Sequence, residues 1–363
     1  MVPVRDRAAQ GLTRVTLLTE IPAPYRIPLF NALADRVSLR VVFLRERHPD
    51  RPYKLHRDEL KFDWRVIRGL AVTLRSRWFV LNVSVGGRLR HADVVILGGW
   101  NQPAYWEALA WCHIRGIPTI VWSESTGRDN RSGRHELFKR VLLPGVDAFI
   151  VPGAAAREYL LSLGVTADRI TVAPNAVDPG IFGAAKRTRE NGICRLVAVA
   201  RLSPEKGLDV LLEAIDGLPV ELVIAGTGPE ESRLRRLAGP NVTFLGNVER
   251  DALPGLYADA DIAVAPSRSD PWGMVLNEAA LAGLPLVSTT APGAAQELIE
   301  EGVNGFRVAP DDPGALRDAI LRLEQDEPFR RAAGERSKEI AARFTPAAWA
   351  DAVAAAVAER IPA

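Results

Sequence analysis

Residues 262–288, IAVAPSRSDPWGMVLNEAALAGLPLVS, read as a strand, a loop, a helix and a second strand in direct succession. The apolar run at 262–265 has the length of a strand, and apolar residues then recur at 275, 276, 279 and 281 with the spacing of one helix face. Gly283 and Pro285 stop the helix before a second apolar run at 286–288. Parallel strands need a crossover connection of this kind. The stretch therefore predicts an α/β fold.

The same alternation extends along the chain on both sides of this stretch. Further strands are predicted at 15–18, 39–44, 94–97, 119–122, 148–151, 195–199, 220–225 and 242–245, and helices at 207–215, 230–237 and 251–257. The chain has 363 residues, which exceeds the size at which a single core keeps growing. Together these features predict two doubly wound, Rossmann-like units.

A turn-rich segment at 174–180 and a polar stretch at 186–192 separate the two series of strands. We expect a first domain at 1–183 and a second at 184–345, with the Ala-rich final segment 346–363 crossing back as a helix onto the first domain. Ligands of such folds bind beyond the carboxyl ends of the strands. Two domains facing each other would therefore place their binding loops around one central cleft.

Composition limits the class of protein and its location. The sequence has no apolar stretch long enough to span a membrane and no secretory signal pattern, so we expect a cytoplasmic protein. Cys112 and Cys194 lie far apart without nearby His or Cys partners, which argues against a zinc site or a disulfide framework.

The net charge of +2 hides an asymmetry between the two halves. Residues 1–183 contain 26 Lys and Arg against 17 Asp and Glu, whereas the rest contains 20 against 27. Much of the excess lies in an Arg-rich stretch at 45–77, which contains Trp64 and is followed directly by Trp78 and Phe79. Such a stretch suits an anionic membrane surface or an acidic acceptor, and a merely solvated face is the alternative. No nucleic-acid-binding module accompanies the charge, so a nucleic-acid partner is not expected.

Two carboxylates and two cations follow predicted strands of the second half. Asp270 precedes the helix that Gly273 opens, and Glu278 lies about two turns into it. The start of this helix offers free N–H groups that suit a diphosphate. Arg201 and Lys206 share a loop and can converge on one anion. Taken singly, each of these residues could instead be a helix cap or a solvated charge.

The order of the motifs is more specific than any one of them. In succession the chain has ARLSPEKG (200–207), IAGTGPE (224–230), FLGNV (244–248), the pair Asp270 and Glu278, and PGAAQELI (292–299). This series resembles the nucleotide-sugar-binding half of the retaining family-4 glycosyltransferases, which have the GT-B fold. The linker APNAVD at 173–178 also resembles the hinge segment of that family. Residues 170–310 carry the specific likeness, and the first half matches more loosely.

The resemblance implies a role for each matched residue. The residues that would bind the donor diphosphate are Arg201 and Lys206, with Gly226 and Gly228 in the turn beneath it. Glu278 would bind the ribose hydroxyls, and Asp270 would face the donor sugar together with backbone N–H groups near Gly273, Met274 and Val275. Asn247 and Val248 would meet the base. The reaction would need no metal ion and no cofactor.

The sequence departs from the family pattern at several positions. Asp270 stands where Glu is usual, and Glu124 stands where many relatives carry His. Glu124 could bind a donor hydroxyl or accept an acceptor proton, or it could pair with Arg128 or Arg131. Candidates for acceptor binding follow two other strands of the first half: Tyr25, Arg26, Trp100 and Asn101. Packing at the domain interface is the alternative for Trp100.

The sequence therefore predicts a retaining glycosyltransferase that moves a sugar from a nucleotide sugar to an acceptor hydroxyl. The acceptor would be lipid-linked, a polysaccharide or a small molecule, and the basic first domain favours a peripheral location at the inner face of the membrane. Two alternatives remain open. A nucleotide-sugar epimerase of the same fold would convert the donor without an acceptor, using Glu124 and Asp270 for proton transfer. A non-catalytic subunit would bind the donor without transferring it.

Overall fold

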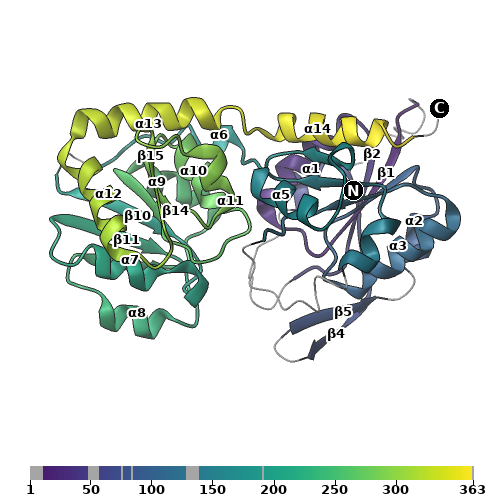
Figure 1. Cartoon of the computed structure of the whole chain (residues 1–363), viewed down its shortest axis with the longest axis horizontal. Helices are drawn as coiled ribbons and strands as arrows, with labels where there is room; N and C mark the ends of the chain where they lie inside the picture. Colours follow the sequence, from purple (N-terminus) through teal and green to yellow (C-terminus); the bar gives the residue numbers. More distant parts are fainter. Residues whose placement is uncertain are drawn as a thin grey trace.

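Two parallel β-sheets, one in each half of the chain, form the framework of the molecule (Figure 1). The computed structural model describes residues 11–47, 57–74, 77–82, 85–127, 139–189 and 192–361. Helices cover both faces of each sheet (Figure 1). The predicted α/β fold with two Rossmann-like units is confirmed.

The first sheet has the strand order β3-β2-β1-β6-β7-β8-β9, with all described neighbours parallel. Its strands are β1 (Arg14–Thr19), β2 (Ser38–Phe43), β3 (Asp63–Val66), β6 (Val94–Leu97), β7 (Thr119–Trp122), β8 (Ala148–Val151) and β9 (Ile170–Val172). The second sheet has the order β12-β11-β10-β13-β14-β15 and is also parallel. Its strands are β10 (Cys194–Val199), β11 (Val220–Ala225), β12 (Val242–Gly246), β13 (Ile262–Ala265), β14 (Leu286–Thr289) and β15 (Gly305–Val308).

Most helices lie in the crossovers between these strands. Those of the first half are α1 (Ile27–Ala34), α2 (Gly86–Leu89), α3 (Pro103–Arg115) and α5 (Ala154–Ser162). Those that follow are α6 (Pro179–Phe182), α7 (Leu208–Ala214), α8 (Glu231–Leu237), α9 (Leu253–Ala258), α10 (Met274–Leu281), α11 (Gly293–Leu298), α12 (Pro313–Gln325), α13 (Glu327–Ala341) and α14 (Pro346–Ala358). Short 3₁₀ turns are η2 (Pro24–Arg26), η3 (Arg57–Glu59), η4 (Leu143–Gly145), η5 (Ala167–Arg169), η6 (Pro204–Lys206) and η7 (Arg250–Ala252).

The central strands are apolar along their whole length because helices bury both faces of the sheet. All four residues of β6, β7, β8, β13 and β14 are buried. This continuous burial explains why apolar runs in the sequence located the central strands well. The edge strands β3 and β9 were not predicted, because β3 contains two charged residues and β9 has only three residues.

Helix α14 leaves the second half and packs against the first sheet (Figure 1). The Trp349 ring lies 5.1 Å from Trp122 and 6.3 Å from Phe30, centroid to centroid, and Trp349 is buried. Thr345 caps the helix by accepting the N–H of Ala348. The chain therefore crosses between the halves twice, once after β9 and once before α14.

An antiparallel hairpin stands outside the two sheets. Strands β4 (Gly69–Leu74) and β5 (Arg77–Asn82) pair with each other and project from the lower side of the first half in Figure 1. The sequence analysis treated this region as part of a basic surface stretch and did not predict its strands. Among the described residues, no helix combines the length and the apolar character needed to cross a bilayer.

Candidate functional site

The loop after β10 carries the two predicted cations and gives them different partners. Lys206, at the end of η6, donates from Nζ to Oδ2 of Asp270 at 2.6 Å, and both side chains are largely buried. Arg201 pairs with Glu205 and remains half exposed. Burial alone would raise the pKa of Glu205, but hydrogen bonds from Ser203 and Arg201 outweigh it and lower that pKa. The two cations of this loop therefore point to different partners: Lys206 contacts the loop after β13, and Arg201 contacts its own loop.

Asp270 connects this loop with the start of α10. Its Oδ1 accepts the backbone N–H of Trp272 at 3.3 Å, and its Oδ2 holds Lys206. Gly273 follows with a φ of +89°, a left-handed conformation that favours glycine, and precedes the first turn of α10. No side chain caps this helix, so N–H groups near Gly273, Met274 and Val275 are available at its N-terminus. Their direct contact with a donor remains a prediction.

Gly226 and Gly228 allow two binding loops to touch backbone to backbone. A Cβ on Gly226 would come within 1.9 Å of the carbonyl oxygen of Ala200, and one on Gly228 within 2.3 Å of that of Leu202. The N–H of Leu202 donates to the carbonyl of Thr227 in the same contact. These glycines therefore fix the loop that carries Arg201, in addition to the predicted turn beneath a diphosphate.

Glu278 contacts Tyr257, which lines a small apolar pocket. The Tyr257 hydroxyl donates to Oε2 of Glu278 at 2.8 Å. Burial raises the pKa of Glu278 to about 7, against the opposing effects of the Tyr257 hydrogen bond and the charge of Arg250. Burial likewise raises the pKa of Tyr257, so its hydroxyl stays a donor. A carboxylate held in this way is suited to accept hydrogen bonds from the hydroxyl groups of a ligand.

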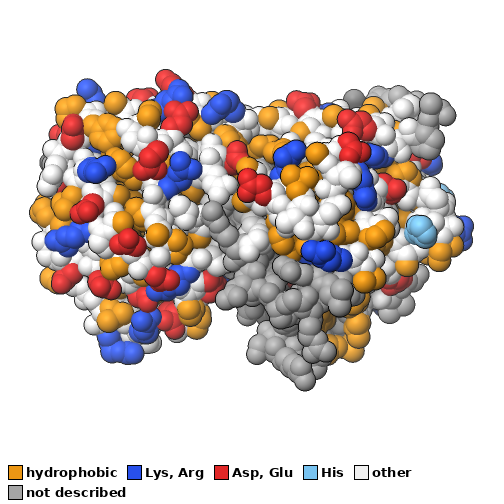
Figure 2. Space-filling model, in the orientation of Figure 1, with side chains coloured by type: hydrophobic (Ala, Val, Ile, Leu, Met, Phe, Trp, Pro, Cys, Tyr) orange, Lys and Arg blue, Asp and Glu red, His pale blue; other side chains and the backbone are white. Residues whose placement is uncertain are grey.

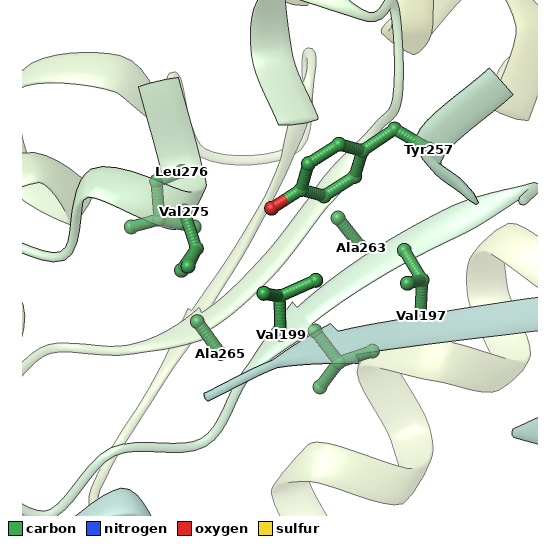
Figure 3. Close-up of a pocket in the computed structure, with 8 residues that line it drawn as sticks. Val197, Val199, Tyr257, Ala263, Ala265, Val275 and Leu276 are labelled. Atoms are coloured by element: carbon green, nitrogen blue, oxygen red, sulfur yellow. The ribbon is translucent and has the colours of Figure 1, made fainter. Parts of the chain in front are cut away.

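Figure 3 shows the pocket that Tyr257 lines. The Tyr257 side chain extends over the ends of β10 and β13 toward α10, where Val275 and Leu276 lie (Figure 3). Its other lining residues are Val197, Val199, Ala263, Val264 and Ala265. Asn247 and Val248, the predicted base-binding residues, lie just after β12, with Asn247 exposed and Val248 partly buried.

In the first half, Glu124 is held by Arg26 and Asn175. Arg26 Nη2 lies 3.3 Å from Oε1 of Glu124, and Asn175 Nδ2 donates to the same oxygen at 2.9 Å. The Arg26 guanidinium also stacks 4.4 Å from the centre of the Trp122 ring, and lies 5.7 Å from that of Tyr25. The proposed partners Arg128 and Arg131 lie outside the described residues. Arg26 thus contacts a carboxylate, and acceptor binding by Arg26 or Tyr25 remains a prediction.

Trp100 and Asn101 follow β6 and differ in exposure. Trp100 packs on Phe149 with ring centres 6.4 Å apart, and the buried Lys139 lies 4.7 Å above its ring. Its indole Nε1 donates to Ser125 at 3.4 Å. Trp100 therefore packs within the first half, rather than at the domain interface as the alternative interpretation expected. Asn101 is exposed, and its role as an acceptor ligand is untested.

A chain of buried hydrogen bonds joins the two halves. The Trp272 indole Nε1 donates to Oδ1 of Asn277 at 2.8 Å, and Asn277 Nδ2 donates to the carbonyl of Asn175 at 3.2 Å. The Asn175 side chain then reaches Glu124. Sequence reasoning missed Asn277, although an amide inside an apolar helix face is a signal that a buried partner is needed.

Two further contacts cross between the halves. Glu297 of α11 accepts the N–H of Ala154 at the start of α5 at 2.8 Å, and Arg250 pairs with Glu59 at 3.2 Å. All of these residues follow carboxyl ends of strands in their own sheets. The carboxyl edges of the two sheets therefore face each other, as expected for two domains that share one site.

Comparison with known families identifies the chain. The family model described as Glycosyl transferases group 1 matches residues 194–326, and the model described as Glycosyltransferase Family 4 matches residues 29–180. The chain belongs to the family 4 glycosyltransferases. The predicted family is confirmed, and the two matches meet near the linker between the two sheets.

Solved structures show that this family 4 member has the GT-B fold. The HepE protein of Anabaena, in complex with UDP and glucose, aligns with a TM-score of 0.77 and 19% identity, over 95% of this chain and all of that one. The sucrose-phosphate synthase of Thermosynechococcus elongatus aligns with a TM-score of 0.74 and 19% identity, over 95% of this chain and 98% of that one. At these identities the likeness establishes the fold.

Curated relatives have different activities. An exopolysaccharide phosphotransferase of Streptomyces coelicolor is 30% identical over 87% of this chain and 34% of its own length. The sulfoquinovosyl transferase SQD2 of Arabidopsis thaliana is 31% identical over 55% of this chain and 42% of its own length. The D-inositol 3-phosphate glycosyltransferase of Mycolicibacterium smegmatis is 34% identical over 58% of this chain and 52% of its own length. The chain thus spans about a third to a half of these relatives.

Proposed function

We propose that this protein is a retaining glycosyltransferase that moves a hexosyl group from a nucleoside diphosphate sugar to an acceptor hydroxyl without a metal ion. The observation that carries the proposal is the contact of Lys206 with Asp270 in the loop just before α10, the helix that carries Glu278 and its hydrogen bond from Tyr257 of α9. One edge of the second sheet then carries Lys206, Asp270, the N-terminus of α10 and Glu278, whose carboxylate can accept hydrogen bonds from hydroxyl groups. HepE, with the same fold, was solved with UDP-glucose.

In this proposal the second half binds the donor. Glu278 accepts hydrogen bonds from the ribose hydroxyls, and the N–H groups at the start of α10 receive the diphosphate. Lys206 and Arg201 approach the diphosphate, and Lys206 exchanges part of its contact with Asp270 for a phosphate oxygen. Asp270, whose ion pair with Lys206 is then weakened, accepts hydrogen bonds from hydroxyl groups of the donor sugar. These groups replace the charge that a metal ion would supply.

The reaction proceeds on one face of the sugar. The bond between the anomeric carbon and the diphosphate oxygen breaks, and the acceptor oxygen forms its bond to the same carbon from the same side. The acceptor proton passes to the departing diphosphate oxygen, so no protein nucleophile is needed. The developing negative charge on the diphosphate is stabilised by Arg201 and Lys206, which act where charge appears in the transition state.

The first half binds the acceptor in this proposal. Glu124 is fixed by Arg26 and Asn175 at the carboxyl edge that faces the donor loops, and the exposed Asn101 lies after a neighbouring strand. A lipid-linked, polysaccharide or small-molecule acceptor fits this scheme. We further propose a cytoplasmic location, because nucleotide sugar donors would be available there.

The experiment has two stages. A thermal-shift screen across nucleotide sugars finds the donor, because a bound ligand raises the melting temperature by mass action. Transfer with that donor is then measured for Arg201→Ala and Lys206→Ala, with Arg235→Ala as a matched control, since Arg235 is an exposed arginine paired with Glu231 on α8. We expect kcat to fall about 100-fold or more in the first two variants and to stay unchanged in the control. Turnover like that of the wild type in both site variants refutes the assignment.

The same screen separates the alternatives. Conversion of the donor into another nucleotide sugar without any acceptor would indicate an epimerase. Donor binding with no transfer to any acceptor in an extract would indicate a non-catalytic subunit.

A further inference from the structure

The β4–β5 hairpin has one face that packs on the protein and one that does not. In its register Leu70 lies opposite Leu81, and Val72 opposite Phe79. Leu70 is 68% exposed, Leu81 49% and Val72 38%, whereas the adjacent Val80 is fully buried. Opposite residues of an antiparallel pair point to the same side of the ribbon. Leu70, Leu81 and Val72 therefore form an outward apolar face, which we call the hairpin face.

The chain around the hairpin face is basic. Residues 64–92 contain six arginines, at positions 65, 68, 75, 77, 88 and 90, and no Asp or Glu. Arg65, in β3, and Arg68, just before β4, are exposed, and Arg65 also pairs with Asp63 at 3.3 Å. Arg75 lies outside the described residues, as do Arg51 and Lys54 of the predicted basic stretch 45–77. The hairpin thus combines exposed aliphatic side chains with positive charge.

The hairpin is anchored to loops of the candidate site. The N–H of Val80 donates to Oε1 of the buried Gln102 at 2.9 Å, and Asn82 Nδ2 donates to the carbonyl of Leu44 at 3.0 Å. Gln102 directly follows Asn101, and Leu44 directly follows β2, so both anchors lie at the carboxyl edge of the first sheet. Figure 1 shows the hairpin projecting there, and Figure 2 shows hydrophobic side chains at the lower edge of the same half. A surface bound by the hairpin face would lie beside the acceptor loops.

We propose that the hairpin face docks on an anionic lipid surface and presents a membrane-embedded, lipid-linked acceptor to the site. Leucines at a lipid interface bury apolar area among headgroups and acyl chains, while arginines beside them are attracted to anionic headgroups. A second copy of the chain is a poorer occupant, because two hairpin faces in contact would bring two acid-free basic segments together. The acceptor part of this inference rests on the proposed function, whereas the lipid binding does not.

The test is vesicle co-sedimentation of the full chain. Wild-type protein should bind vesicles of phosphatidylcholine with about one third phosphatidylglycerol, and should bind pure phosphatidylcholine vesicles at least about tenfold more weakly. The variant Leu70→Ser with Leu81→Ser should lose about tenfold in partitioning to the anionic vesicles. The variant Arg65→Gln with Arg68→Gln should lose a similar amount and become less sensitive to salt. A matched control, Ile193→Ser with Leu237→Ser, removes two comparably exposed apolar side chains of the second half and should bind as the wild type does.

The outcomes are distinct. Equal binding to neutral and anionic vesicles, or unchanged binding of both hairpin variants, overturns the inference. A hairpin variant that is monomeric where the wild type is dimeric by size-exclusion chromatography also overturns it, in favour of a second copy. The thermal shift with the donor is measured in parallel and should be the same in all variants. Absence of any donor shift in the wild type would refute the proposed function and leave the lipid binding as a separate result.

Discussion

Donor binding should weaken as the pH falls through 7, because Glu278 must be ionised to accept hydrogen bonds from both ribose hydroxyls. Its pKa of about 7 results from burial, which outweighs the Tyr257 hydrogen bond and the Arg250 charge. About half of Glu278 is then ionised at pH 7, about one tenth at pH 6 and about one hundredth at pH 5. The dissociation constant of the donor nucleotide should therefore rise about tenfold for each pH unit below 7 and be constant above about pH 8.

The same group should affect the stability of the unliganded protein in the opposite sense. Since the pKa of Glu278 is about 7 in the folded state against 4.5 ordinarily, the folded state binds the additional proton between these values. The stabilisation is fully present below pH 4.5 and is lost as the pH rises through 7. A difference of this size corresponds to about 3 kcal/mol of unfolding free energy. Donor affinity should thus increase over the pH range in which the empty protein loses stability.

Two substitutions make this reasoning testable. Calorimetric titration with the nucleoside diphosphate of the best donor gives the pH dependence of affinity, and urea unfolding gives that of stability. Glu278→Gln should remove both dependences between pH 5 and 7. Tyr257→Phe deletes the hydrogen bond that lowers the pKa, so its midpoint should move to higher pH. An affinity midpoint near 4.5 in the wild type, or no shift in Tyr257→Phe, would refute the account.

Three further predictions follow from contacts between loops and between halves. Gly226→Ala should lower the unfolding free energy by several kcal/mol, since its Cβ would meet backbone at 1.9 Å, whereas Gly255→Ala on α9, with open space around its Cβ, should be neutral or stabilising; thermal unfolding compares the two. Asn277→Leu should lower the unfolding free energy by about 2 kcal/mol and raise the donor KM, because the Trp272 indole N–H and the Asn175 carbonyl both lose their hydrogen-bond partner. Asn277→Asp should keep the bond from the indole but not the bond to the linker, so its KM in steady-state kinetics should lie between those of the wild type and of Asn277→Leu. Arg250→Glu should weaken donor binding at low salt, because it removes both the ion pair with Glu59 and the positive charge near Glu278. Adding Glu59→Arg should restore the ion pair between the halves but not the charge near Glu278, so donor affinity should stay low; full donor affinity in the double variant would contradict a role for that charge.

The sequence located the central strands and the loops of the second half because both depend on local signals. Apolar runs mark strands that are buried on both faces, and Arg201, Lys206 and Asp270 each follow such a run. Their spacing along the chain predicted one shared site. It did not predict that Lys206 would contact Asp270 directly while Arg201 turns to Glu205, because side-chain partners depend on how the loops pack.

The contacts across the two halves were beyond sequence reasoning. Glu124 was expected either to serve the reaction or to pair with a neighbouring arginine. The described structure instead gives it Arg26, 98 positions earlier in the chain, and Asn175, 51 positions later. Long-range pairs of this kind have no periodic signature. The hairpin was missed as well, because the arginines before β4 and near its turn marked the region as a charged surface and not as a pair of strands.

The return of α14 to the first sheet affects how the protein is made. Trp349 fills the space between Phe30 and Trp122, so the core of the first half contains residues that leave the ribosome after the whole second half. The second sheet can complete its core from a continuous segment, whereas the first must wait. We expect the carboxyl-terminal half to reach protease resistance earlier during synthesis than the amino-terminal half. Limited proteolysis of stalled nascent chains measures this order. If the amino-terminal half became protease-resistant first, α14 would be dispensable to the core of the first half.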